Sequence, residues 1–504
     1  MQKKIGALLA YINVFVQNGV YLLYTPLLLR FLGESAYGLF QLTSQAVNTL
    51  TILSMGFASA YVRFYWLQKN KSNYDVNLLN GVYILFFGVI SIVTLCIGAL
   101  MSNNAESLFS SSFTSDDIMI AKKLILVMTV NVAIGFISSV FNSYIIANEK
   151  FIFQQIRVLL ATLLQPILAF ILLNLKFGIL SIALIQLFLT IVLLVMSIHY
   201  AIWRIEMRFS FGKKQFVLAK GIFSFASFIL INQIVDLVNN NVPGMIVGKY
   251  LTATDVAIYA VVIQIRSLFF QLSLAMSNIF VPQVNKMVLN RDEDELTSLM
   301  ASVGRIQLSI LLFVLGGFIV LGQSFITMWA GSGFNISYWM IIVMVIPVLV
   351  PLSQNIGIEI QRAMNLHKVR SFSLGILAVM NILITVLCVR YFGVFGSVMG
   401  YIFSIVVGNG IIMNVYNHKV VRLNMKVYWC RVIPLVLVPV IPVLAGVVAS
   451  RIFDTGKILS FVGVGILYSA IFGVLWVKKA ANEQEREMIS RFISKMKFRK
   501  RLIG

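Results

Sequence analysis

A polar stripe interrupts the long apolar stretch 221–247 near its middle. Its members recur at helical spacing, so they share one side of a helix: Asn232, Asp236, Asn239 and Asn240. A charged side chain in hydrocarbon costs about 2.5–3.5 kcal/mol on insertion scales, so the stripe must face protein or water. Two interpretations follow. The stripe is a cation or proton site or part of a substrate cavity, or it is a hydrogen-bonded contact between helices.

Arg266 lies near the middle of the next apolar stretch, 257–282. A guanidinium binds phosphate through two parallel hydrogen bonds, so Arg266 is a candidate for holding an anionic group. The alternative is an ion pair with Asp236 on the neighbouring helix. The two interpretations are compatible if an anionic ligand displaces Asp236 from Arg266.

Four further residues are candidates on weaker grounds. Arg63 and Arg157 lie toward the ends of their apolar stretches, where they either reach the headgroups or line the mouth of a cavity. Asn381 and Thr385 are four residues apart and share a helix face, for which hydrogen bonding between helices is the default.

The elements that position these residues are membrane spans. Hydrophobic residues make up 59% of the chain and charged residues 12%, and the mean hydropathy is +0.92. The apolar blocks are long enough to cross a hydrocarbon core of ~30 Å at ~1.5 Å per residue. We predict fourteen spans, at 5–29, 38–64, 78–101, 118–146, 152–175, 178–203, 221–247, 257–282, 302–329, 336–358, 369–390, 394–416, 428–450 and 457–477.

The net charge of +22 reflects topology rather than nucleic-acid binding. Most of the 40 Lys and Arg residues lie in alternate loops and in the tail 478–504. The positive-inside rule makes that side cytoplasmic and places both ends of the chain there. We expect the tail to lie on anionic lipid headgroups.

A weak internal repeat predicts two related lobes. Pro26 and Pro243 stand at corresponding points of spans 1 and 7, and the loops around Lys176-Phe-Gly178 and Tyr391-Phe-Gly393 also match. A six-span offset gives a parallel repeat, as in secondary transporters; chance similarity of apolar strings is the alternative. The predicted organisation is an N-lobe at 1–203, a basic linker at 204–220, a C-lobe at 221–417, spans 13 and 14 at 418–477 and a basic tail at 478–504.

The sequence lacks the motifs of an ATPase or a metalloenzyme. It contains no phosphate-binding loop of the G-x-x-x-x-G-K-[ST] type, and its histidines have no metal-ligand spacing. The connections between spans are too short for a catalytic domain. We therefore expect a secondary transporter, with no catalytic residue and no cofactor.

Two motifs carry a family resemblance. The run Arg30-Phe-Leu-Gly-Glu-Ser-Ala-Tyr-Gly-Leu-Phe and the run Gly56-Phe-Ala-Ser-Ala-Tyr-Val-Arg-Phe-Tyr resemble the polysaccharide transporters. That family includes the Wzx-type O-antigen flippases. It belongs to the multidrug/oligosaccharidyl-lipid/polysaccharide (MOP) exporter superfamily.

The resemblance implies an all-α membrane fold of two six-helix lobes in a V, plus two C-terminal helices. It implies a flippase of the bacterial cytoplasmic membrane that moves undecaprenyl-pyrophosphate-linked oligosaccharide, such as an O-antigen unit for lipopolysaccharide, to the outer leaflet by ion-coupled alternating access. Candidate partners are this lipid, anionic membrane lipids and a polysaccharide polymerase, and we expect a monomer. The cavity candidates are Arg266, Arg63, Arg30, Arg157, Asn239 and Asn240.

For the related lipid II flippases, the resemblance implies a sodium site with an acid in span 7 and polar residues in spans 11 and 12. Asp236 and Asn381 fall at matching places, and Na⁺ and H⁺ are the candidate coupling ions. Thr385 stands where an acid is expected, which departs from that pattern. The alternatives are a lipid II flippase, a multidrug/cation antiporter of the same superfamily, or a polytopic polymerase or glycosyltransferase of glycan assembly, which the short loops disfavour.

Overall fold

The described part of the chain is almost entirely helical. The computed structural model describes residues 2–54, 57–69, 73–108, 113–212, 215–290, 292–364, 366, 368–483 and 485–487, and it contains no strand in these ranges. The prediction of an all-α membrane fold is confirmed.

The chain divides into two compact units. Unit 1 comprises Met1–Ile263 and Leu374–Tyr401, and unit 2 comprises Gln264–Ser373 and Ile402–Gly504. Each unit therefore combines segments that are distant in the sequence. This division rests on contacts and differs from the predicted lobes, whose boundaries remain a prediction.

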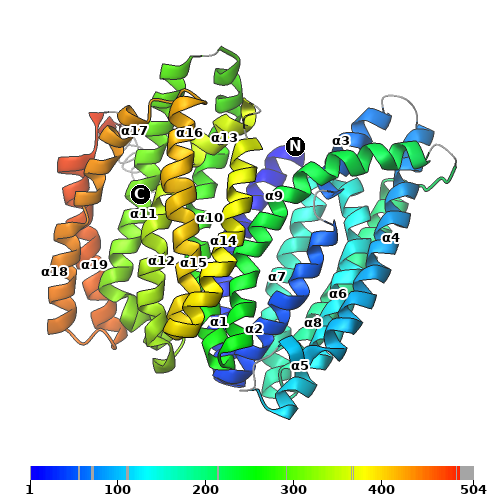
Figure 1. Cartoon of the computed structure of the whole chain (residues 1–504), viewed down its shortest axis with the longest axis horizontal. Helices are drawn as coiled ribbons and strands as arrows, with labels where there is room; N and C mark the ends of the chain where they lie inside the picture. Colours follow the sequence, from blue (N-terminus) through cyan, green and yellow to red (C-terminus); the bar gives the residue numbers. More distant parts are fainter. Residues whose placement is uncertain are drawn as a thin grey trace, which may run out of the picture. The chain divides into compact units, whose positions relative to one another are not determined.

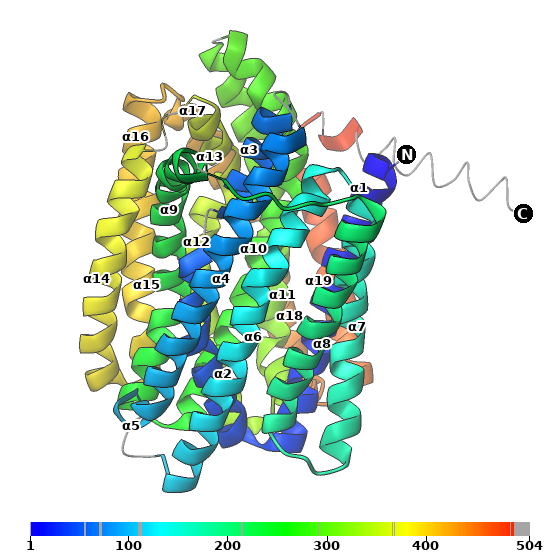
Figure 2. The same cartoon turned by 90° about the vertical axis from the view of Figure 1, so that its right-hand side faces the viewer.

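Unit 1 is built around helix α6, which packs against α2, α3, α4 and α8. Figures 1 and 2 both show α4, α6 and α8 side by side. The helices of this unit are α1 (Gln2–Leu32), α2 (Glu34–Asn48), η1 (Thr49–Ser54), α3 (Phe57–Lys69), α4 (Asn73–Asn103), α5 (Ala105–Leu108), α6 (Ser115–Ala147), α7 (Phe151–Asn174), α8 (Leu180–His199), η2 (Tyr200–Arg204), α9 (Gln215–Tyr250), the start of α10 (Ala253–Asn290), most of α14 (Lys368–Phe392) and η4 (Gly393–Val398).

Unit 2 is built around α11, which packs against α12, α17, α18 and α19. Its last two long helices, α18 and α19, lie side by side in Figure 1. The helices of this unit are the rest of α10, α11 (Glu293–Trp329), η3 (Ser332–Phe334), α12 (Asn335–Ser353), α13 (Asn355–Ala363), α15 (Met399–Ser404, which begins in unit 1), η5 (Ile405–Ile412), α16 (Met413–Lys419), α17 (Met425–Val432), η6 (Ile433–Leu437), α18 (Val440–Ile452), α19 (Ile458–Leu475) and η7 (Trp476–Ala480).

Two glycines at matched places of the predicted repeat have a left-handed backbone. Gly178 follows α7 with φ +71°, and Gly393 follows α14 with φ +58°. An L side chain rarely adopts this left-handed region, whereas glycine enters it freely. The surroundings of the two glycines differ, because Gly178 lies four residues after the end of α7, beyond Lys176 at φ +59°, whereas Gly393 directly follows α14 and begins η4.

The span predicted at 336–358 is a broken helix. Helix α12 contains Pro347 and Pro351 and ends at Ser353, and α13 begins at Asn355. Proline removes a backbone donor, so nearby carbonyls lose a helical partner. The break leaves the Ser353 carbonyl at the end of α12, where the Tyr428 hydroxyl donates to it at 3.0 Å.

Eleven segments in the described ranges are long and apolar enough to cross a membrane: Ile12–Leu32, Val76–Asn103, Ser115–Ala147, Phe151–Asn174, Leu180–Arg204, Ala253–Val281, Glu293–Trp329, Ser332–Ser353, Val369–Lys419, Met425–Ile452 and Ile458–Ala480. Val369–Lys419 has 51 residues and contains the turn at Gly393, so it covers both predicted spans 369–390 and 394–416. The predicted spans 38–64 and 221–247 are not among the eleven. The first is divided into α2, η1 and α3, and the second lies within the long helix α9. The count of fourteen remains a prediction.

Candidate functional site

Unit 1 contains a polar cavity among α1, α7 and α8. Its volume is about 260 Å³. At ~30 Å³ per water molecule, it has room for several waters or a small hydrated group, but not for a whole glycolipid. The lining residues are Gln17, Val20, Tyr21, Tyr24, Arg157, Val158, Ala161, Thr162, Gln165, Pro166 and Leu193.

Arg157 supplies the positive charge of this cavity. Its side chain is only 7% exposed, and one guanidinium nitrogen, Nη1, donates to the Ser197 hydroxyl of α8. Its Nε–H meets no acceptor, and no carboxylate pairs with it, among the residues that the structure describes. A buried guanidinium without a carboxylate keeps hydrogen-bonding capacity for a water or an anion. The sequence allowed two interpretations of Arg157, a contact with the headgroups or a position at the mouth of a cavity. Its burial beside this cavity fits the second.

The walls of the cavity are fixed by contacts between α1 and α7. The Asn13 amide donates to the Gln155 backbone carbonyl at 2.8 Å and to the Gln155 side-chain oxygen at 2.6 Å. Ser197 is held in turn, because its hydroxyl donates to the Leu193 carbonyl at 2.6 Å. These hydrogen bonds therefore fix the helices that surround the Arg157 guanidinium.

A second polar cluster joins α9 to α14. The Asn381 amide donates to Asn239 Oδ1 at 2.8 Å, and the Thr385 hydroxyl donates to Asn381 Oδ1 at 3.1 Å. Asn381 and Thr385 are 0% exposed. The predicted shared face of α14 is confirmed by this chain of hydrogen bonds.

Gly400 packs directly against this cluster. A Cβ at that position would collide with the Thr385 hydroxyl and with the Asn381 backbone carbonyl. The chain therefore needs a residue without a side chain there, and the Asn381–Thr385 pair is tightly enclosed. Three uncharged oxygen-bearing side chains meet at this point.

The remaining sequence candidates differ in their exposure. Arg30 ends α1 and is exposed, and Arg63 and Asn240 are exposed as well. Arg266 belongs to unit 2, is 4% exposed and lies 5.5 Å from the centre of the Phe270 ring. Asp236 lies on α9 one turn before Asn239, but its side chain is outside the described part, and so is its suggested pairing with Arg266.

A buried polar cluster in unit 2 was not predicted. The Gln307 amide of α11 donates to the Ser277 hydroxyl at 2.6 Å and to the Ser273 carbonyl at 3.1 Å. Asn355, at the start of α13, donates to the Ser273 hydroxyl at 2.8 Å. The signal that could have located it is the break in the predicted span 336–358, where a polar Gln-Asn pair follows two prolines.

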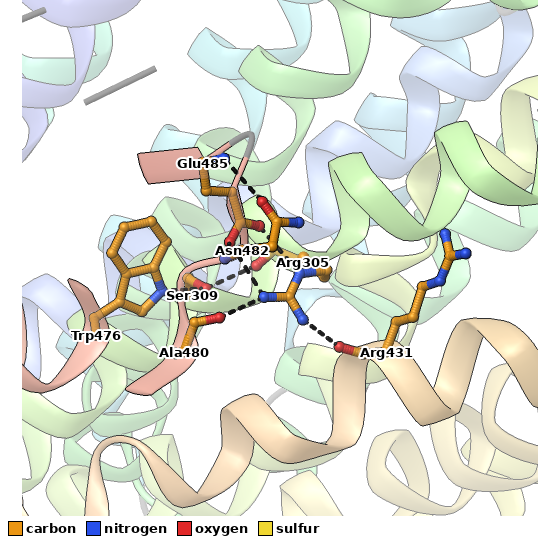
Figure 3. A network of polar contacts seen from close by, with 7 residues as sticks. All are labelled: Arg305, Ser309, Arg431, Trp476, Ala480, Asn482 and Glu485. Carbon is orange, nitrogen blue, oxygen red and sulfur yellow. Dashed lines mark hydrogen bonds and ion pairs between the residues drawn. The ribbon is translucent and has the colours of Figure 1, made fainter. Parts of the chain in front are cut away.

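A second arginine network in unit 2 also escaped prediction. Arg305 of α11 donates to both carboxylate oxygens of Glu485, at 3.0 and 3.1 Å, and to the carbonyls of Arg431 and Ala480, each at 2.6 Å (Figure 3). Asn482 and Glu485 cap one another across the start of the last described turn. From the sequence, Arg305 counted only as a topology signal.

The described residues contain no group of three or more His, Cys, Asp or Glu side chains that could hold a metal ion. The side chains of the polar clusters described above supply guanidinium, amide and hydroxyl groups, and Glu485 adds one carboxylate.

Long apolar helices that enclose buried polar clusters define a polytopic membrane protein. The family model described as polysaccharide biosynthesis protein matches residues 6–288, more than half of the chain. The chain belongs to this family, and the predicted resemblance is confirmed. No curated protein sequence matches the chain significantly.

Solved structures with the same fold cover nearly the whole chain. The lipid II flippase MurJ, in an inward closed conformation, is 16% identical over 93% of this chain and 99% of its own, with a TM-score of 0.74. An inward-facing multidrug resistance MATE transporter of the MOP superfamily is 14% identical over 82% and 95%, with a TM-score of 0.61. The Vibrio cholerae MATE transporter VcmN, in the bent form, is 13% identical over 84% and 99%, with a TM-score of 0.54. At these identities the likeness establishes the fold.

Proposed function

We propose that this protein is a flippase that carries a lipid-linked oligosaccharide of surface polysaccharide synthesis across the membrane. The carrier lipid would be undecaprenyl pyrophosphate, and the direction would be from the inner to the outer leaflet of the bacterial cytoplasmic membrane. Membership of a polysaccharide biosynthesis family supports the glycan class of cargo. The fold shared with a lipid II flippase supports translocation.

The observation that carries the proposal is the buried, carboxylate-free Arg157 on a polar cavity. A pyrophosphate cannot enter hydrocarbon without compensation of its charge, because ions lose their hydration there. A guanidinium with donors to spare compensates that charge and keeps water beside it. Because the cavity is much smaller than a glycolipid, Arg157 would meet only the pyrophosphate or the water around it.

Arg266, Arg30, Arg63, Asn239 and Asn240 complete the proposed polar path. Arg266 combines burial with a positive charge, as Arg157 does. Arg30 and Arg63 are exposed. Arg63, at the predicted cytoplasmic end of its span, suits a first encounter with the pyrophosphate, and Arg30, at the predicted outer end of span 1, suits its release. Alternating access would bring these groups to the cargo in turn.

Ion coupling is proposed at Asp236, Asn381 and Thr385. Asn381 and Thr385 form a buried hydrogen-bonded pair, and Asp236 lies one helical turn before their partner Asn239. A hard cation such as Na⁺ prefers oxygen ligands of this type, and a carboxylate would alternatively carry H⁺. We propose no catalytic residue and no resident cofactor.

The proposed setting is a monomer in the cytoplasmic membrane with both ends in the cytoplasm, beside a polysaccharide polymerase. The charge distribution supports this orientation. A lipid II flippase is the second candidate, because the MurJ fold covers nearly the whole chain.

Purified protein in liposomes that contain a polyprenyl-pyrophosphate oligosaccharide tests the proposal. Translocation is read as the fraction of sugar that becomes accessible to an external glycosidase. We expect wild-type protein to transport and Arg157→Gln to lower the rate at least tenfold, because the anionic group loses its charge-assisted donor. Arg157→Lys should recover part of the rate, since it keeps the charge without the planar donors.

The control is Arg204→Gln, which removes one exposed positive charge from another part of unit 1. It should transport at the wild-type rate. An Arg157→Gln protein that transports normally would remove Arg157 from the path. Transport of lipid II in place of the oligosaccharide by the wild type would replace the proposal with its second candidate.

A further inference from the structure

A groove in unit 2 lies between the end of α16 and the start of α17. Its volume is about 760 Å³, within the ~300–1,000 Å³ typical of ligand pockets. Figures 1 and 2 both place α16 and α17 next to one another. The lining residues are Asn414, Val415, His418, Lys419, Met425, Lys426, Trp429, Cys430, Ile433 and Pro434.

The walls of this groove are fixed by one asparagine. Asn414 Oδ1 accepts from Trp429 Nε1 at 2.8 Å and from the Gln354 amide at 3.0 Å. The Asn414 amide donates to the Asn409 carbonyl at 2.8 Å, where the helix η5 is wider than an α-helix. Asn414 thus ties α17 and the broken helix α12–α13 to its own helix, and the groove is formed before any ligand enters.

The lining combines an apolar interior with two lysines. Val415, Met425, Trp429, Ile433 and Pro434 make the interior mainly apolar. Beyond Ile433 the chain continues into exposed apolar residues, among them Leu437, Ile441 and Leu444. A ligand with long hydrocarbon chains can therefore leave the groove along an apolar surface.

Two lysines give the groove a positive charge. The ammonium groups of Lys419 and Lys426 form no ion pair and no hydrogen bond with any residue that the structure describes, and both side chains are exposed. Nearby arginines differ, because Arg422 reaches Glu293 at 3.6 Å and Arg431 donates to Ser298 at 3.4 Å. Of these four basic side chains, the two on the groove are therefore the ones without a described polar partner.

The position of Lys426 adds to this charge. It lies in the first turn of α17, where the backbone N–H groups give the helix end a partial positive charge. A cation at that end is repelled, whereas an anion there is attracted by the helix and by both lysines. We propose that the groove binds an anionic glycerophospholipid, with its phosphate at Lys419 and Lys426 and its acyl chains along Val415 and Ile433.

The leaflet follows from the same charges. The loop between α16 and α17 belongs to the side that the positive-inside rule makes cytoplasmic, and that leaflet carries the anionic lipids. This binding is separate from cargo translocation, because none of the residues on the proposed transport path lines the groove.

Native mass spectrometry of the full-length protein, released from detergent micelles doped with phosphatidylglycerol, tests the proposal. We expect one phosphatidylglycerol retained by the wild type. Lys419→Gln/Lys426→Gln should bind about 30-fold more weakly, the loss expected for two surface lysines near an anionic lipid. Val415→Trp should also lose the lipid, because the indole fills the groove while both lysines remain.

The matched control is Lys220→Gln/Lys286→Gln, which removes two exposed lysines outside the groove and should retain the lipid. All variants should unfold at the wild-type temperature, since the altered residues are exposed. Equal retention by the groove double variant, or equal binding of phosphatidylcholine, overturns the proposal. Displacement by inorganic phosphate would show a free-anion site instead, and tighter binding of undecaprenyl phosphate would assign the groove to the cargo.

Discussion

Arg157 in unit 1 and Arg305 in unit 2 are both largely buried, but they are bound in opposite ways. Arg305, 12% exposed at its side chain, makes a two-bond ion pair with Glu485, which is 8% exposed, and also donates to two backbone carbonyls. Arg157 has one described hydrogen bond, to a neutral serine, and borders a cavity.

The difference separates a structural arginine from one available to a ligand. All three nitrogens of the Arg305 guanidinium donate hydrogen bonds, and these hold the segment after α19 against α11 and α17. The Arg157 fork has unused donors, and water or an anion must satisfy them. Burial alone does not distinguish these roles; the number and charge of the partners does.

The largest expected effect is on Arg305. Arg305→Ala leaves the Glu485 carboxylate buried without its partner, so we expect a loss of about 3–5 kcal/mol in the free energy of unfolding. Unfolding in mixed detergent micelles, followed by circular dichroism, measures this loss. Arg431→Ala is the control, because its exposed side chain can be removed while its backbone carbonyl remains for Arg305. A loss below 1 kcal/mol for Arg305→Ala would contradict the structural role.

An intermediate effect is expected at the neutral cluster of α9 and α14. Thr385→Val keeps the shape of the side chain but removes the donor to Asn381, which costs about 1 kcal/mol. If sodium binds there as proposed, NaCl should raise the unfolding temperature of the wild type above that in choline chloride, and Thr385→Val should reduce this difference. The exposed Thr327→Val serves as control. An undiminished sodium effect in Thr385→Val would separate the ion from this cluster.

The smallest effect on stability is expected at Arg157. Arg157→Met leaves no carboxylate behind and fills similar volume, so the free energy of unfolding should change by less than about 1 kcal/mol. The same denaturation assay measures it beside Arg305→Ala. A loss comparable to that of Arg305→Ala would mean that Arg157 is structural too, and the comparison would fail.

The sequence predicted features that depend on neighbours along one helix. Twelve of the fourteen predicted spans are covered by segments that are long and apolar enough to cross a membrane, because length and hydropathy decide that property locally. The shared face of Asn381 and Thr385 followed from their spacing alone.

Features that depend on packing between distant helices were not predictable in this way. The burial of Arg157 depends on how α1 and α8 pack against α7, and periodicity does not specify that register. Glu485 lies 180 residues after Arg305, and nothing local to either residue indicates the other. The span predicted at 38–64 is polar, and the structure divides it where local signals gave no boundary.

The separation of Arg305 and Glu485 also has a consequence for biosynthesis. Arg305 is synthesised long before Glu485. Its guanidinium therefore has no Glu485 carboxylate to pair with while the last spans are made. Chains that stop before the end of α19 never supply that partner, nor the Ala480 carbonyl. The Arg305–Glu485 contact therefore closes only after residue 485 has been made, and a chain that ends earlier keeps the Arg305 guanidinium without its carboxylate.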